Sequence, residues 1–427
     1  MSELLVAVNQ DLVGAVAQGA NGRLHFTYEE GWRDRDDSYP LSLSMPLGER
    51  EYGDGAIRPF LEGLLPDNAD ILQTWARRFQ VSPRNPFSLL SHMGEDCAGA
   101  LQFVRPERYE SVFLAGQGGV DWLTEEAIAD RLRDLVQRHG TGRLAGDQGY
   151  FSLAGAQPKM ALFYDGEGWG IPFGTMPTTH VLKPPAQAQL HGLAANEHLC
   201  LRLAQELGME TARSDVSTFA GEQALVVRRY DRLRMDDGRW IRLHQEDAAQ
   251  ALAVSPLRKY EREGGPGAPA IVQLLLEESS DPDTDVGAFL DTLALNWVMG
   301  GTDAHAKNYS LLIRPGSVRL APLYDLVSIL PYPHFVHPRE AKLSMRVHRE
   351  YALWKIRRRH WEGLASDCRL DPQPVVERVR EVVAATPEAL ERAVRSVREE
   401  GVQHEVVGRI ATMIQENAER CLRMLDG

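Results

Sequence analysis

The sequence is poor in cysteine and has no long apolar run. Its 427 residues include four cysteines, which lie far apart and form no C-x-x-C pair (Cys97, Cys200, Cys368 and Cys421). This pattern argues against a disulfide framework or a cysteine zinc site and indicates free thiols in a reducing compartment. No apolar run reaches the roughly 18 residues of a membrane span, and the first residues lack the features of a signal peptide. A cytoplasmic location is therefore expected.

An excess of positive charge is also missing. The chain carries 47 basic and 60 acidic residues, which gives a formal net charge of −13. This balance argues against strong nucleic-acid binding by the chain alone but leaves room for a basic partner. A locally basic region lies among the C-terminal residues and contains Arg378, Arg380, Arg392, Arg395 and Arg398. We interpret it as a solvated helix face, with a phosphate-contacting patch as the alternative.

What is present is the composition of a globular protein, 43% hydrophobic and 25% charged, long enough for two or three domains. Short alternating runs predict that residues 1–105 are rich in β-strands. Within them, GLLPDN at residues 63–68 predicts the end of one helix and a cap for the next, through Asp67 or Asn68. Further along, the acidic run Glu277–Asp285 is interpreted as a solvated loop, and the chain from Pro338 onward as helical.

The most informative stretch is residues 296–328, NWVMGGTDAHAKNYSLLIRPGSVRLAPLYDLVS. A predicted buried helix ends at Gly300-Gly301, and two short predicted strands joined by a turn then lead to Asp325. Asp303 and Asn308 have the D-x-x-x-x-N spacing of a protein-kinase catalytic loop, in which the Asp accepts the substrate proton and the Asn binds magnesium. Asp325 then takes the place of the later kinase Asp, the one that holds the metal, in Tyr324-Asp325-Leu326 instead of Asp-Phe-Gly. The alternative is a polar loop between two core elements.

Three upstream segments fit the same interpretation. The glycine-spaced loop at residues 141–163 resembles a phosphate-binding turn, although a surface loop is the alternative. A predicted strand ends at Lys183, which would either pair with nucleotide phosphates or simply extend to solvent. Glu197 lies in the first turn of the next predicted helix, where it would form an ion pair with Lys183 or complement the helix dipole.

Seven motifs in order resemble the HipA family across essentially the whole chain: SLAGAQPK, THVLKP, ANEHLCLRLA, VVRRYDR, LHQEDAAQAL, GGTDAHAKN and YDL. The segments GLLPDN and GEDCAGAL are similar to its N-terminal part. The resemblance implies an α+β, protein-kinase-like two-lobed fold with a β-rich N-terminal subdomain and an all-helical C-terminal lobe. The implied domains are residues 1–106, residues 107–232 with the phosphate loop and hinge, and residues 233–427 with the catalytic and metal-binding loops.

The resemblance also implies an activity and partners. HipA proteins are serine/threonine-kinase toxins of type II toxin–antitoxin modules that use ATP and Mg²⁺, and some phosphorylate aminoacyl-tRNA synthetases. The usual partner is a small helix-turn-helix antitoxin, HipB, which bridges the toxin to operator DNA.

Roles are carried over by position. Asp303 resembles the catalytic Asp, Asn308 and Asp325 resemble the metal ligands, and Ser152 resembles the autophosphorylated loop serine. The other implied ATP-binding residues are Ala154, Gly155, Ala156, Gln157, Lys159, Lys183, Arg228, Tyr230, His305, Lys307 and Tyr324. One departure is Pro158, which has no N–H to offer a phosphate.

Two other classes of function remain as alternatives. One is a catalytically quiet kinase-like co-repressor that acts through a DNA-binding antitoxin, which the presence of Asp303, Asn308, Asp325 and Lys183 disfavours. The other is a metal-dependent hydrolase built on Asp303, His305 and Asp325, which is disfavoured because no further histidines follow at ligand spacing.

Overall fold

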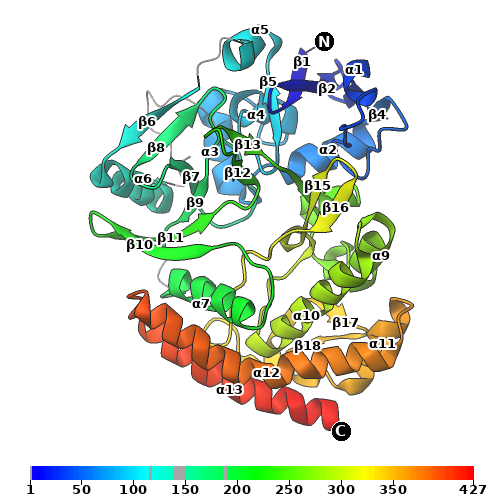
Figure 1. Ribbon diagram of the computed structural model, residues 1–427, viewed down its shortest axis with the longest axis vertical. Coiled ribbons are helices and arrows are strands. Elements are labelled where there is room, and N and C mark those ends of the chain that lie inside the picture. The colour runs from blue at the N-terminus through cyan, green and yellow to red at the C-terminus, as the bar shows by residue number, and fades with distance from the viewer. Residues whose placement is uncertain (1, 115–117, 139–150, 186–189) are drawn as a thin grey trace. The chain divides into compact units, whose positions relative to one another are not determined.

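The computed structural model describes residues 2–114, 118–138, 151–185 and 190–427 (Figure 1). The chain forms two compact units, each built from three segments. Unit 1 comprises Met1–Pro184, Ser217–Leu257 and Leu311–Val318. Unit 2 comprises Pro185–Val216, Arg258–Ser310 and Arg319–Gly427. The part of the glycine-spaced loop at residues 141–150 lies outside the described residues.

The N-terminal part of unit 1 is an antiparallel five-stranded sheet in the order β4-β3-β2-β1-β5. Its strands are β1 (Ser2–Val8), β2 (Asp11–Gln18), β3 (Leu24–Tyr28), β4 (Glu51–Gly53) and β5 (Leu101–Val104). The helices of this part are α1 (Glu30–Arg33), α2 (Asp54–Gly63), α3 (Ala69–Phe79), α4 (Pro86–Met93) and α5 (Pro106–Tyr109), the last followed by a π-helical turn at Glu110–Leu114. Alternating apolar residues of the strands bury Leu4, Val6 and Phe26 in one core with Phe60 and Trp75. The predicted β-rich start is therefore confirmed.

The cap predicted within GLLPDN is also confirmed. The side chain of Asn68 accepts hydrogen bonds from the backbone amides of Asp70 and Ile71, at 2.9 and 3.3 Å, and so begins α3. Such a cap satisfies amides that the first helical turn leaves without a partner.

A six-stranded sheet in the order β10-β11-β9-β7-β8-β6 forms the rest of the core of unit 1. Its strands are β6 (Gly119–Leu123), β7 (Met160–Tyr164), β8 (Trp169–Phe173), β9 (His180–Lys183), β10 (Ser214–Phe219) and β11 (Glu222–Arg228). Helix α6 (Glu125–Arg138) packs Ile128, Leu132 and Leu135 against this sheet. Shorter elements follow β11, namely β12 (Arg232–Arg234), β13 (Trp240–Arg242), β14 (His244–Asp247) and α8 (Ala248–Ala251).

Unit 2 is mainly helical. Its helices are α7 (Leu193–Glu206), α9 (Ala268–Glu278), α10 (Pro282–Met299), α11 (Arg358–Asp367), α12 (Pro372–Glu399) and α13 (Glu405–Asp426). Helix α12 packs against α7, α10, α11 and α13 (Figure 1). Its apolar stripe of Val375, Val379 and Val383 is buried. The hairpin predicted after Asn308 is present as β15 (Ser310–Arg314) and β16 (Ser317–Leu320). Its residues Leu311–Val318 belong to unit 1, where the hairpin extends a sheet begun by β14.

Two local predictions were wrong. The chain after Pro338 first forms a second hairpin, β17 (Lys342–Val347) and β18 (Glu350–Ala352), and becomes helical at Arg358. In β17, Leu343, Met345 and Val347 are buried on one face of a strand of six residues. An alternation this short is a weak signal, and the sequence interpretation missed it.

The acidic run Glu277–Asp285 is not a solvated loop. It ends α9 and begins α10, where the side chain of Asp281 caps the helix by accepting a hydrogen bond from the amide of Thr284. Asp285 is buried and accepts hydrogen bonds from the Arg319 guanidinium of β16 at 3.0 to 3.2 Å. A distant cation therefore compensates the burial of this carboxylate.

The C-terminal arginines are mostly neutralised by neighbouring acids. Arg378 forms an ion pair with Asp291 at 2.6 Å. Arg380 pairs with Asp426 at 2.6 Å, and Arg392 with Glu206 at 2.7 Å. These exposed pairs favour the solvated helix face over a phosphate-contacting patch.

Candidate active site

The loop that carries Asp303 begins where α10 ends. Gly300 ends this helix with φ +71°, a left-handed conformation that a side chain disfavours. A Cβ on Gly301 would lie 2.0 Å from the amide oxygen of Asn296, so the chain turns back tightly against the helix at this point. A larger residue at either position would therefore be disfavoured, by backbone conformation at Gly300 and by a clash at Gly301. The turn that the two glycines allow places the polar residues that follow at the end of a buried helix.

Asp303 and Asn308 lie together, as their spacing predicts. The Asn308 side-chain amide donates a hydrogen bond to the Asp303 carbonyl at 3.1 Å, and the amide of His305 donates to the same oxygen at 2.8 Å. Asn308 is buried, whereas Asp303 is exposed and accessible to a substrate. Because the nitrogen of the Asn308 amide is committed to Asp303, its oxygen is the atom left to act as a metal ligand.

Asp325 reaches the same loop by way of Tyr324. The Tyr324 hydroxyl donates to the Lys307 carbonyl at 2.6 Å and lies 2.7 Å from the Ser310 hydroxyl. Asp325 itself has φ +57°, which is rare for a residue with a side chain.

The segment around Asp325 is held on both sides by other parts of unit 2. Before it, the amide of Leu323 donates to the Glu210 carbonyl at 2.9 Å, and the amide of Ala212 donates to the Leu323 carbonyl at 2.8 Å. After it, the buried Asn196 side chain of α7 bonds both backbone groups of Ser328, at 2.8 and 2.9 Å. These anchors hold the unusual backbone of Asp325 in place.

In unit 1, the predicted phosphate loop is a tight turn after Ser152. Gly155 has φ +105°, and Lys159 donates from its Nζ to the Ala154 carbonyl at 2.7 Å. The loop is attached to the cap of α3, because the Asp67 amide donates to the Gly155 carbonyl at 3.1 Å. Asn68 donates to the carbonyl of Ala156 at 3.4 Å. The sequence interpretation assigned Asp67 and Asn68 only to helix capping, so it missed their contacts with this loop.

Ser152 is fully buried at the start of this loop. Its hydroxyl donates to the Leu64 carbonyl at 2.8 Å, and its amide donates to the Asp96 carbonyl at 2.9 Å. A phosphate group cannot be added to this hydroxyl unless the segment moves, because the side chain has no exposed surface.

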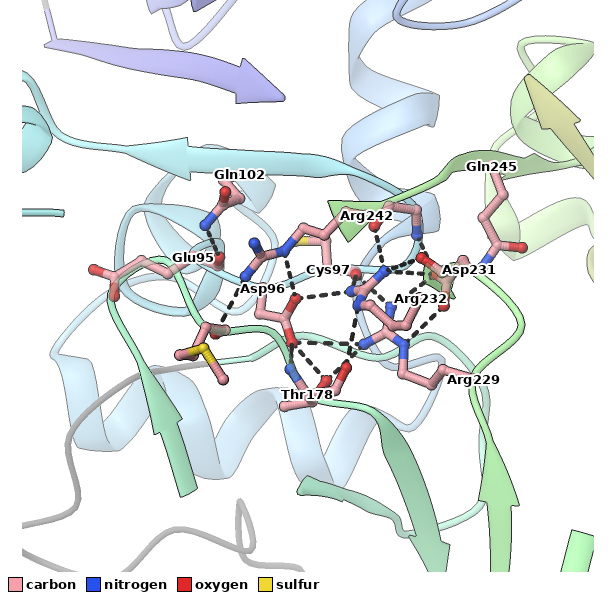
Figure 2. A network of polar contacts seen from close by, with 12 residues as sticks. Glu95, Asp96, Cys97, Gln102, Thr178, Arg229, Asp231, Arg232, Arg242 and Gln245 are labelled. Atoms are coloured by element: carbon pink, nitrogen blue, oxygen red, sulfur yellow. Dashed lines mark hydrogen bonds and ion pairs between the residues drawn. The ribbon is translucent and has the colours of Figure 1, made fainter. Parts of the chain in front are cut away.

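Asp96 lies at the centre of a buried ionic network (Figure 2). Its carboxylate pairs with Arg232 at 2.8 Å, accepts from Arg242 at 3.2 Å and accepts from the Thr178 hydroxyl at 2.5 Å. A second buried carboxylate, Asp231, pairs with Arg229 at 2.8 Å. Burial alone would raise the pKa of Asp96, but the nearby guanidinium groups outweigh it and hold that pKa far below its usual range. The network therefore contains ionised groups at neutral pH.

The same network reaches the predicted hinge. The Tyr230 hydroxyl donates to the side chain of Gln245, which in turn donates to the Asp231 carboxylate at 3.0 Å. Arg228 is exposed at the end of β11, whereas the Arg229 side chain turns into the network. The ionic network thus connects the start of the predicted phosphate loop, which bonds Asp96, with the predicted hinge of unit 1, which contacts Asp231 through Gln245.

Lys183 and Glu197 are both buried, the first at the end of β9 and the second in α7. They belong to different units, and their pairing stays a prediction. Within the ranges that the structure describes, no group of three or more His, Cys, Asp and Glu side chains forms a metal-binding cluster. Among those same residues, no helix is both long and apolar enough to cross a bilayer.

Known protein families match this chain over both its N-terminal and its C-terminal part. Residues 4–104 match the HipA N-terminal domain, and residues 151–390 match the HipA-like C-terminal domain. The protein Y4mE of Sinorhizobium fredii is 38% identical over 385 residues, which cover 89% of each chain. The serine/threonine-protein kinase toxin HipA of Shewanella oneidensis is 33% identical over 349 residues, 76% of this chain and 73% of that one.

The solved structure of Shewanella oneidensis HipA with HipB and its operator DNA contains a chain that superimposes with a TM-score of 0.83. The two chains are 26% identical, and the match covers 99% of this chain and 98% of the other. The predicted kinase-like fold, with its β-rich N-terminal part and helical C-terminal part, is thereby confirmed. The chain therefore belongs to the HipA family and is a HipA-like serine/threonine protein kinase of the toxin–antitoxin type.

Proposed function

We propose that this kinase transfers the γ-phosphate of ATP to a serine or threonine of a cellular protein, with Asp303 as the proton acceptor. The observation that carries the proposal is the arrangement in unit 2. An exposed Asp303 is held by Asn308, and Tyr324 attaches the segment of Asp325 to the same loop. A positioned carboxylate that accepts the hydroxyl proton contributes roughly 10²- to 10⁴-fold to such a reaction.

Asn308 and Asp325 are proposed to hold Mg²⁺. Both offer oxygen atoms, which this hard cation prefers, and the Asn308 nitrogen is already bonded to the Asp303 carbonyl. When bound, the metal neutralises charge on the phosphates of ATP. His305 and Lys307, both buried, are proposed to line the nucleotide site beside these two residues, with Tyr324 next to Asp325.

Unit 1 is proposed to contribute the remaining contacts with ATP. The turn formed by Ala154, Gly155, Ala156, Gln157 and Lys159 is proposed to approach the phosphates, since Gly155 adopts a backbone conformation available to few other residues. Lys183 is proposed to pair with the phosphates and with Glu197, and Arg228 and Tyr230 are proposed to contact adenine. The bond from Tyr230 to Gln245, which itself donates to Asp231, supports this last role because it fixes the position of the Tyr230 side chain.

Ser152 is proposed to act as a self-inactivating switch. Its hydroxyl is buried and bonded to the Leu64 carbonyl, so a phosphate of about −1.5 to −2 charge cannot be accommodated there. Autophosphorylation would therefore require the loop to leave its place and would prevent its return, which disrupts the phosphate-binding turn.

The proposed partner is a small helix-turn-helix antitoxin of the HipB kind, with operator DNA bound mainly through it. The solved Shewanella oneidensis complex supports this partner, and the net charge of −13 suits a basic protein better than DNA. An aminoacyl-tRNA synthetase is the first substrate class to test, on the family resemblance. The competing function is a catalytically quiet co-repressor.

A phosphoproteome of host cells, before and after brief expression, distinguishes kinase from quiet co-repressor. The wild-type chain should add phosphate to one or a few proteins, and Asp303→Ala should add none while still binding ATP. The matched control is Asp236→Ala, which removes an exposed carboxylate of unit 1 and should behave as wild type. Equal phosphorylation by wild type and Asp303→Ala would refute the assignment of Asp303.

A further inference from the structure

A second side chain contacts the proposed proton acceptor. The hydroxyl of Tyr260 donates a hydrogen bond to Oδ1 of Asp303 at 2.6 Å, although the two residues are 43 positions apart. This distance is typical of a charge-assisted O–H···O⁻ bond, which is stronger than a neutral one. Asp303 is exposed on a loop that follows two glycines, and this bond ties Oδ1 of its carboxylate to a residue of another segment.

Tyr260 is itself held rigidly within unit 2. Its carbonyl accepts from the amides of Glu263 and Gly265, at 2.9 and 3.0 Å, and its ring packs edge-on against His305 with centroids 5.0 Å apart. The next residue, Glu261, accepts from the Arg346 amide of β17 at 2.7 Å and pairs with its guanidinium at 3.0 Å. A residue fixed in this way can set the orientation of the carboxylate to which it donates.

The hydroxyl of Tyr260 keeps its proton and so remains a hydrogen-bond donor at neutral pH. Burial, and then the hydrogen bond to Asp303, raise the pKa of Tyr260 above its usual value. The hydroxyl therefore stays protonated at neutral pH and can donate to the carboxylate.

We propose that Tyr260 is a positioning residue that holds the Asp303 carboxylate in the orientation needed to accept the proton of the substrate hydroxyl. The inference rests on the proposed role of Asp303. A carboxylate has about four acceptor sites, so one bond to Tyr260 at Oδ1 is compatible with a second bond to the substrate. The opposite possibility is that the Tyr260 hydroxyl imitates the substrate and has to be displaced before reaction.

The test is Tyr260→Phe, which removes the hydroxyl and keeps the ring beside His305. With the substrate found in the phosphoproteome, kcat should fall about tenfold or more, as for the loss of a hydrogen bond to a charged group. The KM for ATP and the affinity for an ATP analogue should change less than about twofold. Tyr164→Phe is the matched control, because its hydroxyl bonds only the Gly166 carbonyl among its described hydrogen bonds and is exposed.

Three results would overturn the proposal. A kcat equal to wild type in Tyr260→Phe, with a loss only in Tyr260→Ala, would show that the ring has a packing role alone. A kcat above wild type would show that the hydroxyl competes with substrate. The third is a crystal structure of Tyr260→Phe in which Asp303 keeps one unchanged rotamer. This last measurement needs no activity, so a failure of the proposed function is distinguishable from a failure of this inference.

Discussion

Replacement of Asp96 by Asn should destabilise the chain strongly. The wild-type network combines three arginines and two aspartates, all 7% exposed or less. Asp96→Asn keeps the shape of the side chain but leaves Arg229, Arg232 and Arg242 with one buried carboxylate. Breaking a buried ion pair by removing one partner costs about 3–5 kcal/mol, because the remaining charge stays buried without compensation.

The expected loss is measurable by calorimetry and by urea unfolding at pH 7. For a unit of 150–250 residues, each kcal/mol lowers Tm by about 2–4 °C. The Tm for the unfolding of unit 1 should therefore fall by roughly 6–20 °C. The matched control is Asp237→Asn, whose partner Arg239 lies at 2.7 Å on the surface, and it should cost less than about 1 kcal/mol. If Asp96→Asn were within about 1 kcal/mol of wild type, the network would not stabilise unit 1 as described.

The pH dependence of this loss has a definite sign. The folded-state pKa values of Asp96 and Asp231 are depressed, the latter to about 2. Each carboxylate therefore contributes stability that is complete above its unfolded pKa of about 3.9 and is lost as the pH falls toward the folded value. The difference in stability between wild type and Asp96→Asn should be constant from about pH 5 to 7 and should shrink between about pH 4 and 2. A difference that grew on acidification would contradict the assignment of an ionised Asp96.

Three further outcomes are expected. Asp325→Ala should weaken binding of Mg-ATP analogues in isothermal titration and lower phosphate transfer, because a proposed metal ligand is lost; unchanged affinity and activity would remove Asp325 from the site. Incubation with Mg-ATP should produce phospho-Ser152 by mass spectrometry, with activity declining over the same time course in wild type but not in Ser152→Ala; a phosphorylated fraction that stays active would refute the switch. In gel-shift titrations, the chain alone should bind operator DNA weakly and with strong dependence on salt; tight sequence-specific binding without an antitoxin would contradict the charge argument.

Much of the local structure follows from short-range patterns. The cap at Asn68, the two glycines after α10, and the hairpin before Asp325 were all predicted, because caps, breaks and strand periodicity depend on neighbouring residues. The pairing of Asn308 with Asp303 also follows from spacing, since one short turn brings the two together.

The sequence by itself therefore determined the family, the kinase-like spacing and the residues proposed for catalysis. Only the tertiary structure decided which distant groups form hydrogen bonds with the proposed site and the network beside it. Tyr260 bonds Asp303 from 43 positions away, Asn196 bonds Ser328 from 132 positions away, and Arg232 bonds Asp96 from 136 positions away. The tertiary structure also decided that Asp285 is buried, since the cation that compensates it lies on β16. Local patterns report the conformation of a segment, whereas the pairing of charges and hydrogen bonds between segments depends on how the whole chain packs.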